Sequence, residues 1–380
     1  MNKLVLIVTN IPTPYRIPLF NEVARQLRTE GFRLCVVFGA WGYERRRWEI
    51  DPSSFEFDYH VLGGEGFYLG KSESISFRYR KLIRYIRTVK PALVIVSGYS
   101  IAAMKLWIWS ILTSTQYCIW SGSLSGHGAA KSRMRAVQRR LLVSRAVNFI
   151  AYGSRSADYL ASLGAAKSRI FTAINTVDTE FYRNTISNAE SVSRSGEKKV
   201  ILYVGNLTAG KRVDLIMQAL SQLLPRRNDF LFRIVGDGVE RSKLEATAND
   251  LGIADVVEFT GFKQKEDVAD YLSGATCFVF ASAYDIWGLV LVEAMAAGVP
   301  CIASVQPGAT VDLIEDGRTG FSIDFENLEL AGDRIERLLD DPVEARRIGE
   351  AGREFVATKV SIPVSAAGFV AAVQNALPSD

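Results

Sequence analysis

Residues 277–304 read CFVFASAYDIWGLVLVEAMAAGVPCIAS, and they contain the pattern of a strand, a loop, a helix and a second strand. The apolar runs CFVFA (277–281) and CIAS (301–304) are typical of parallel strands that are buried on both faces. Between them, residues 289–297 are apolar almost all round and stop at a Gly-Val-Pro sequence, which predicts a short buried helix. The stretch therefore predicts a βαβ unit, the building block of a parallel sheet.

One carboxylate interrupts this apolar helix. Glu293 falls about one turn into it, and a charged side chain is rarely buried without a partner. Asp285 lies eight residues earlier, in the loop that leads into the helix. Because a helix N-terminus favours phosphate groups, two carboxylates around it suggest a ligand with hydroxyl groups on both sides of a phosphate, which is a nucleotide sugar. The structural alternative is that Glu293 satisfies a core amide or arginine and that Asp285 caps the helix.

The same alternation of apolar runs and helical patterns extends over most of the chain. A polar, Ser-rich segment at 175–199 interrupts it and is typical of a linker or a surface excursion. We therefore expect an α/β protein with two doubly wound, parallel-sheet domains, 1–175 and 176–359, and a C-terminal helix at about 360–380 that packs back on the first. The apolar segment 101–112 is too short to span a membrane, which needs about 20 residues, and is predicted to be a core helix.

Small or functional residues follow every strand predicted in the second half. Three of these loops are GNLTAGKR (205–212), GDG (236–238) and GF (261–262), and VQPGAT (305–310) follows the strand at 301–304. Ligands of doubly wound sheets bind at the carboxyl ends of the strands. Glycines let backbone N–H groups approach a phosphate, and Lys211 can supply charge. An ordinary turn explains each loop alone, but the whole series in one domain favours a binding site.

Taken in order, these motifs resemble the donor-binding domain of the retaining glycosyltransferases of family 4. The resemblance covers most of 150–325, including INTVDTEFY (174–182), and IPTPYRIPLF (11–20) is similar to the first loop of some members. It implies the GT-B fold, in which two Rossmann-like domains face a central cleft. It also implies transfer of a hexose from a UDP-, GDP- or similar nucleotide sugar to an acceptor.

The resemblance also implies roles for matched residues. Glu293 would hold the ribose, and Asp285 would contact the donor sugar where the family normally has Glu. The diphosphate would be held by Lys211 and by the backbone of Gly288 and Leu289. The base would be bordered by Gly261 and Phe262.

One further position departs from the family pattern. The family usually has Arg where this chain has Asn206, so one charge for phosphate binding is missing. The neighbouring Arg212 would then compensate. Both Asn206 and Arg212 stay candidate substrate-binding residues.

The first domain contributes three candidates. His127 lies in the Gly/Ser loop SGSLSGHGAA after a predicted strand, and the family frequently places a His in a comparable loop. We expect His127 to hydrogen-bond the donor sugar or the leaving phosphate, as a catalytic residue beside Asp285. Tyr15 and Arg16 follow the first strand and are predicted to contact acceptor or phosphate, and the alternative for Arg16 is a solvated loop.

Charge is distributed unevenly between the halves. Residues 1–175 hold 25 Lys and Arg against 10 Asp and Glu, whereas the remaining residues hold 20 against 31. Two predicted helices, 77–90 and 131–145, carry six basic residues each and no acid, and ERRR (44–47) adds to them. Basic amphipathic helices suit an anionic membrane surface, although a solvated helix face is the alternative for either one alone. Nucleic acid is disfavoured because no known motif is present and the second half is acidic.

These observations together predict a metal-independent, retaining hexosyltransferase of cell-surface polysaccharide, lipopolysaccharide or glycolipid synthesis. We expect it in the cytoplasm, peripheral on the inner face of the plasma membrane, with a lipid-linked glycan as acceptor. No metal or cofactor is expected, and Cys35, Cys118, Cys277 and Cys301 are predicted to be buried free thiols. Front-face attack is expected, with double displacement through Asp285 as the alternative. Two other functions stay open: a degenerate partner subunit that only binds nucleotide sugar, and a GT-B epimerase or phosphorylase.

Overall fold

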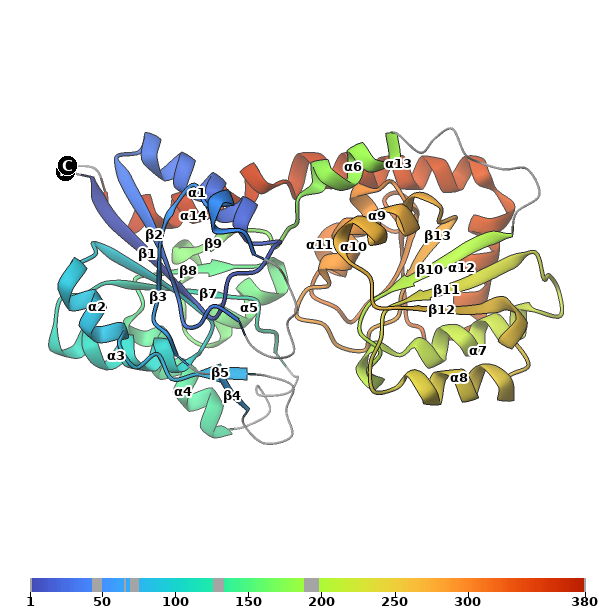
Figure 1. The fold of residues 1–380 in the computed structure, drawn as a ribbon, viewed down its shortest axis with the longest axis horizontal. Coiled ribbons are helices and arrows are strands. Elements are labelled where there is room, and N and C mark those ends of the chain that lie inside the picture. Colours follow the sequence, from blue (N-terminus) through green and yellow to red (C-terminus); the bar gives the residue numbers. More distant parts are fainter. Residues whose placement is uncertain are drawn as a thin grey trace. The chain divides into compact units, whose positions relative to one another are not determined.

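A computed structural model describes residues 2–42, 50–64, 66–68, 75–125, 133–187 and 198–378. The chain forms two compact units (Figure 1). Unit 1 comprises Met1–Val177 and Ile362–Asp380, and unit 2 comprises Asp178–Ser361. The predicted fold class is confirmed, because each unit is built on a parallel sheet with helices on both faces.

The sheet of unit 1 has seven strands in the order β3-β2-β1-β6-β7-β8-β9, and all of its neighbouring strands are parallel. The order reverses between β1 and β6, which makes this pair the topological switch point of the unit. The strands are β1 (Lys3–Thr9), β2 (Phe32–Phe38), β3 (Asp58–Val61), β6 (Leu93–Ser97), β7 (Tyr117–Ser121), β8 (Asn148–Ala151) and β9 (Ile170–Thr172). A separate antiparallel pair is formed by β4 (Gly66–Tyr68) and β5 (Ile75–Phe77).

Helices cover both faces of this sheet because alternate strand residues point to opposite sides. One apolar cluster joins Val5 and Ile7 of β1 to α1 and α14, whereas Leu6 and Val8 belong to the cluster under α2, α3, α4 and α5. The helices are α1 (Ile17–Thr29), α2 (Leu82–Val89), α3 (Ile101–Leu112), α4 (Arg133–Arg145), α5 (Ser154–Ser162) and α14 (Ile362–Ala376).

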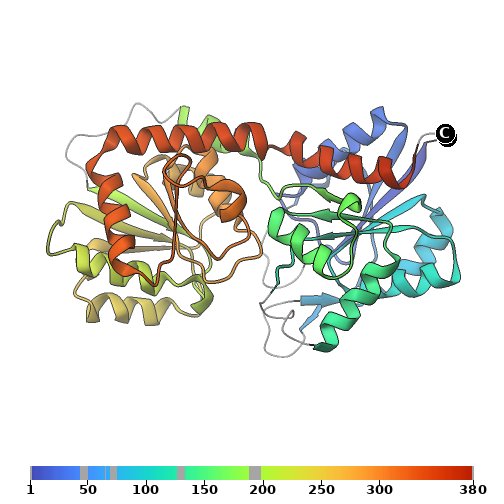
Figure 2. The ribbon, with the colours of Figure 1, turned by 180° about the vertical axis from the view of Figure 1, so that it is seen from behind.

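The C-terminal helix α14 is part of the core of unit 1 and lies beside α1 in both views (Figures 1 and 2). Phe369 is fully buried and meets Trp120 edge to face at 5.0 Å between ring centroids. Asn148 Nδ2 donates to the carbonyl of Ala372 at 2.7 Å. Pro342–Ala376 is the one helical stretch in the described chain that is long and apolar enough to cross a membrane, but its α14 part packs as a core helix does.

The sheet of unit 2 has six parallel strands in the order β12-β11-β10-β13-β14-β15. Its strands are β10 (Lys199–Val204), β11 (Phe230–Val235), β12 (Val257–Gly261), β13 (Cys277–Phe280), β14 (Cys301–Ser304) and β15 (Phe321–Ile323). The order reverses between β10 and β13. The central βαβ unit predicted at 277–304 is therefore observed as β13, α10 and β14, and β13 lies at the switch point.

Helices of unit 2 also lie on both faces of the sheet. The apolar cluster on one face includes residues of α7, α8 and α12, and α9 and α10 contact strands on the other. The helices are α6 (Thr179–Ser187), α7 (Val213–Leu223), α8 (Arg241–Asp250), α9 (Lys265–Ser273), α10 (Leu289–Ala296), α11 (Thr310–Leu313), α12 (Leu328–Asp340) and α13 (Pro342–Lys359).

Two predictions about local structure were wrong. The polar segment 175–199 was predicted to be a linker or a surface excursion, but its residues Thr179–Ser187 form α6, which packs against α9 and α10 and buries Tyr182. The segment 101–112 was interpreted as a core helix, but only one side of α3 is buried. Its other side exposes Met104, Ile108, Ile111 and Leu112 to solvent.

Candidate active site at the switch point of unit 2

The candidate site lies in the loops that follow β10 and β13, the two strands at the switch point. The loop after β10 contains Asn206, Lys211 and Arg212, and the loop after β13 contains Asp285 and Gly288. Ligands of open α/β sheets bind at this place because the loops diverge on either side of it.

Lys211 and Asp285 form an ion pair across these two loops. The Lys211 ammonium donates to Asp285 Oδ2 at 2.5 Å, and each side chain is 23% exposed. The other carboxylate oxygen, Oδ1, accepts the backbone N–H of Trp287 at 3.3 Å. Both oxygens of Asp285 therefore have a donor, while the ammonium keeps two further protons that can be donated to a ligand.

Backbone hydrogen bonds fix the loop that carries Asp285. Ala283 N–H donates to the carbonyl of Gly210 at 3.0 Å, which ties the loop to the one after β10. Gly308 N–H donates to the carbonyl of Asp285 at 3.2 Å, which ties it to the loop after β14. Because the backbone is held from both sides, the Asp285 carboxylate has a defined position.

The glycine loops after β10 and β11 are in direct backbone contact. A Cβ on Gly236 would lie 1.8 Å from the carbonyl oxygen of Gly205, and one on Gly238 would lie 2.3 Å from that of Leu207. Gly236 also has a φ of +146°, which side chains disfavour. The glycines therefore allow these loops to pack closely at the carboxyl edge of the sheet. This packing explains their pattern without a bound phosphate.

The residue before helix α10 is a glycine because a side chain would not fit there. Gly288 has a φ of +100°, and a Cβ there would lie 2.6 Å from the ring of Phe280. No side chain caps the helix, whose first residue is Leu289. In the first turn the N–H of Leu291 donates to the carbonyl of Gly288 at 3.0 Å. The N–H groups before it have no capping side chain, so they can donate to an anion, and the helix dipole favours negative charge there.

The partly buried carboxylate of Glu293 has a hydrogen-bond partner within unit 2. The Tyr182 hydroxyl of α6 hydrogen-bonds to it, and the charge of Lys265 on α9 acts on it as well. Burial raises the pKa of Glu293 to about 7, although the hydrogen bond from Tyr182 and the charge of Lys265 both oppose that rise. Tyr182 was not predicted as a site residue, because it lies in the polar segment 175–199 and no local pattern connects it to α10.

Unit 2 contains four further candidate residues. Asn206 is exposed, and its backbone carbonyl accepts the hydroxyl of Tyr203 at 3.2 Å. Arg212 donates to Glu326 at 2.6 Å and to Asp214 at 3.3 Å, so its guanidinium already has two acidic partners. Gly261 ends β12, and the Phe262 ring that follows it is 63% exposed.

In unit 1, Arg16 lies within a group of aromatic residues. Its guanidinium lies 4.4 Å from the ring centroid of Trp120 and donates to the Tyr152 hydroxyl at 2.9 Å. It also lies 5.4 Å from the ring of Tyr15. Arg16 is therefore held in place by packing, unlike a solvated loop arginine. His127 and the basic residues at 44–47 lie outside the described residues.

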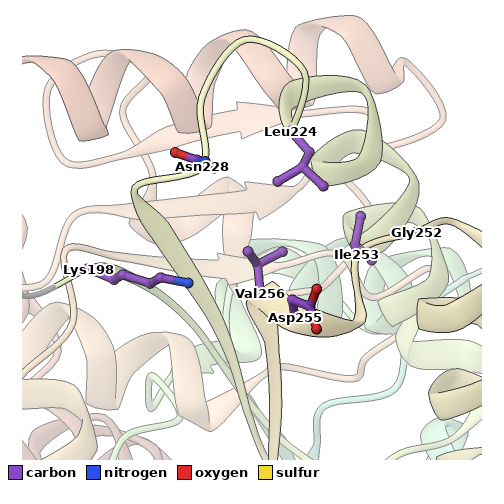
Figure 3. Close-up of a pocket in the computed structure, with 7 residues that line it drawn as sticks. All are labelled: Lys198, Leu224, Asn228, Gly252, Ile253, Asp255 and Val256. Atoms are coloured by element: carbon purple, nitrogen blue, oxygen red, sulfur yellow. The ribbon is translucent and has the colours of Figure 1, made fainter.

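A cavity of about 520 Å³ in unit 2 lies at the other edge of the sheet (Figure 3). Lys198 precedes β10, Asn228 precedes β11 and Val256 precedes β12, so these residues mark the amino ends of the strands. The further lining residues are Leu224, Gly252, Ile253 and Asp255. None of the predicted site residues lines this cavity, so it does not form part of the candidate site.

Possible metal ligands do not cluster in the described part of the chain. No group of three or more His, Cys, Asp and Glu residues there has the arrangement of a metal site. The four cysteines are free thiols and buried, as predicted.

Comparisons with known proteins show what these features are similar to. Residues 185–355 match the family model of glycosyl transferases group 1. The chain is similar to the alpha-D-kanosaminyltransferase of Streptomyces kanamyceticus, with 37% identity over 194 residues, 50% of this chain and 48% of that protein. It is also similar to a GDP-mannose-dependent alpha-(1-6)-phosphatidylinositol monomannoside mannosyltransferase of Mycobacterium tuberculosis, with 30% identity over 248 residues, 62% of this chain and 64% of that protein. The chain thus spans about half to two thirds of the length of these relatives.

A solved structure extends the likeness to both units. HepE of Anabaena in complex with UDP superposes with a TM-score of 0.76 and 18% identity, and the match covers 98% of this chain and 99% of that one. At this identity the match establishes the fold. The chain has the GT-B fold, and its residues 185–355, which are less than half of the chain, are similar to the glycosyl transferases group 1.

Proposed function

We propose that this protein is a retaining glycosyltransferase that moves a hexose from a nucleotide diphosphate sugar to an acceptor. The observation that carries the proposal is the Lys211–Asp285 ion pair, which joins the two loops at the switch point. The first turn of α10, which lacks a side-chain cap, begins four residues after Asp285. The Lys211 ammonium and the N-terminus of α10 can bind the diphosphate, and the Asp285 carboxylate can accept hydroxyl groups of the sugar attached to it.

The chemistry assigned to these residues is leaving-group stabilisation. When the bond between the sugar carbon and the diphosphate oxygen breaks, negative charge develops on the diphosphate. The Lys211 ammonium and the N–H groups at Gly288 and Leu289 donate to that charge. Since these groups supply the positive charge, we expect transfer without a catalytic metal. Addition of EDTA should leave the rate unchanged.

The contacts of Asp285 favour front-face attack over double displacement. A carboxylate nucleophile needs a free lone pair directed at the sugar carbon. Lys211 and the N–H of Trp287 each donate to one oxygen of Asp285, which lowers its nucleophilicity. We therefore assign Asp285 to hydrogen bonding with the donor sugar. His127 is proposed to donate a hydrogen bond to the sugar or phosphate, and Tyr15 and Arg16 to contact the acceptor.

Related proteins support a nucleotide sugar donor but differ in the nucleotide. Structures of HepE contain UDP and UDP-glucose, whereas the mycobacterial relative is GDP-mannose-dependent. For this chain, the proposed placement of the ribose at Glu293 and of the base beside Gly261 and Phe262 applies to either nucleotide.

The decisive experiment measures turnover and stereochemistry together. The chain is incubated with UDP- and GDP-hexoses and a panel of lipid-linked glycans, and NMR records the anomeric configuration of donor and product. Transfer with retained configuration supports the proposal. Inverted configuration, or turnover that needs free phosphate or no acceptor, contradicts it and points to the phosphorylase or epimerase alternative. Binding without turnover indicates a partner subunit.

We further propose that unit 1 binds an anionic membrane surface through adjacent sides of α3 and α4. We call these the α3–α4 face, and it consists of Met104, Ile108, Ile111, Leu112, Met134, Val137 and Leu141, all exposed. Gln138 of α4 donates to the sulfur of Met104 at 3.0 Å, so the two helices meet along this face. Monomeric proteins seldom expose an apolar patch of this kind without a partner.

The positive charge of α4 favours an anionic lipid surface as the partner. Arg133, Arg135 and Arg140 on α4 are exposed, and residues 101–150 contain no Asp or Glu. Each basic residue contributes about 1 kcal/mol near an anionic membrane. Arg139 is different, because it lies 4.7 Å from the ring of Tyr99 and donates to Tyr159, so its loss would disturb packing. A peripheral position on the inner face of the plasma membrane, with a lipid-linked glycan as acceptor, follows as part of this proposal.

Vesicle sedimentation tests the membrane proposal with vesicles of phosphatidylcholine, with or without phosphatidylglycerol. The double variant Ile108→Ser, Leu112→Ser and the triple variant Arg133→Ala, Arg135→Ala, Arg140→Ala should each lose binding to the anionic vesicles. The control is Arg25→Ala, Arg28→Ala, which removes exposed charge from α1. Unchanged binding by both test variants would refute the proposal. The proposal would also be refuted if the wild type did not bind vesicles and the Ile108→Ser, Leu112→Ser variant changed only the oligomeric state.

A further inference from the structure

The contact between α6 and α10 joins a buried tyrosine, Tyr182, to the partly buried carboxylate of Glu293. Tyr182 is 3% exposed, and its hydroxyl hydrogen-bonds to Glu293. Both residues belong to unit 2. Burial and the neighbouring charge of Glu293 raise the pKa of Tyr182, so its hydroxyl keeps its proton and acts as the donor.

Several contacts hold the first turn of α6, which carries Tyr182, in place. Asp178 accepts the N–H of Phe181 at 3.1 Å, which fixes the first turn of α6. The Lys265 ammonium of α9 lies 3.6 Å from the ring centroid of Phe181 and 4.0 Å from Asp178 Oδ2. The Phe181 and Tyr182 rings meet edge to face at 5.1 Å. The Asp178 cap and the contact of Lys265 with the Phe181 ring fix the first turn of α6. The Phe181 ring in turn packs against Tyr182, which favours the position of Tyr182 beside Glu293.

The chemistry of a carboxylate explains what such a bond can do. An ionised carboxylate has two oxygens with about four acceptor positions, so one hydroxyl donor leaves capacity for others. A hydrogen bond to the charged form also favours ionisation. A ligand hydroxyl that donates to Glu293 is held more strongly by the charged form than by the neutral acid, and a defined orientation of the carboxylate favours it further.

We propose that Tyr182 is a positioning residue for Glu293, holding its carboxylate oriented and ionised so that it can accept hydroxyl groups of the bound nucleotide. This inference rests on the proposed function only for the identity of the ligand. The hydrogen bond between the two residues belongs to the protein itself, and its effect on Glu293 can be measured without any ligand.

Other charged groups near Glu293 must be held constant in the test. Elements packed against α10 or next to Tyr182 carry Asp178 on the α6 side, Lys265 and Glu266 on α9, and Arg353 on α13, whose side chain lies near Gly298 at the far end of α10. None of them is changed when Tyr182 is replaced by Phe, which keeps the ring and removes only the hydroxyl.

The experiment compares Tyr182→Phe with wild type in two measurements. The first follows Glu293 by ¹³C NMR of protein labelled at Glu side-chain carboxyls, with Glu293→Gln to assign the signal. Loss of the hydroxyl should raise the midpoint by about one pH unit or more. The second measures the affinity for UDP and GDP from pH 6 to 9. It should fall about tenfold at pH 7 in the variant and recover toward pH 9. Tyr271→Phe, on α9 of the same unit, is the matched control and should leave both unchanged.

The possible outcomes separate this inference from the proposed function. An unshifted titration of Glu293 in Tyr182→Phe overturns the inference. So does unchanged or tighter nucleotide binding in that variant when Glu293→Ala abolishes binding. If instead Glu293→Ala binds nucleotide as wild type does, the proposed ribose contact fails, while the shift of the Glu293 titration still supports an orienting role for Tyr182.

Discussion

Glu293→Gln should make the protein more stable at neutral pH. Burial raises the pKa of Glu293 from 4.5 to about 7 in the folded protein. Between these values the folded protein holds a proton that the unfolded chain releases. Wild-type stability therefore falls as the pH rises from 4.5 to 7, and it is not recovered above that range.

The size of the effect follows from that pKa difference. One pH unit corresponds to about 1.4 kcal/mol, so the wild type should lose roughly 3 kcal/mol over this range through Glu293. Glutamine has no proton to release and can still accept the Tyr182 hydroxyl. The variant should match the wild type near pH 4.5 and exceed it by roughly 3 kcal/mol above pH 7.

Thermal unfolding at a series of pH values measures this difference. For a domain of this size, about 3 kcal/mol corresponds to roughly 6–12 °C in the midpoint of the transition that unit 2 contributes. Glu329→Gln, an exposed change on α12, is the control and should give a gap that does not vary with pH. The reasoning would be refuted if the difference in unfolding temperature between wild type and Glu293→Gln stayed constant from pH 4.5 to 8.

Three further predictions concern other parts of the chain. Lys211→Met should weaken UDP or GDP binding at least tenfold by calorimetry, because a partly buried cation is lost. The control Lys243→Met, at an exposed lysine, should leave the affinity unchanged, and equal affinities of Lys211→Met and wild type would contradict the assignment. Gly236→Ala should destabilise unit 2 by at least about 2 kcal/mol in urea, since its Cβ would meet the backbone of Gly205; Gly274→Ala, with nothing within 4 Å of its Cβ, is the control. Phe369→Ala should cost unit 1 about 3–5 kcal/mol through the cavity it leaves, and a cost below 1 kcal/mol would argue against α14 as part of that core.

The fold could be predicted from sequence because its signals are local. Most strands of the two sheets are short apolar runs, and the helix after β13 is bounded by Gly288 and by the Gly-Val-Pro stop. Such runs predict parallel strands and buried connections wherever they occur. The predicted helix 289–297 therefore differs from the observed Leu289–Ala296 by one residue.

The parts that could not be predicted depend on distant residues. The partner of Glu293 is 111 positions away, in a segment whose Ser-rich composition indicates a linker. The sequence of α3 is apolar on most sides, so it does not reveal that Ile108 and Leu112 are exposed beside α4. The glycines after β10 and β11 suggest a phosphate loop, but the close packing of Gly205 and Gly236 accounts for them as well.

The central claim is that the loops after β10 and β13 bind the diphosphate of a nucleotide sugar. Calorimetric titration of the full chain with UDP, GDP and their hexose conjugates, for wild type and for Asp285→Asn, tests it most directly. We predict that one nucleotide series binds, that its hexose conjugate binds more tightly than the free diphosphate, and that Asp285→Asn removes this gain but keeps binding of the free diphosphate. Absence of binding by every nucleotide, or a gain from the sugar that is unchanged in Asp285→Asn, would contradict the claim.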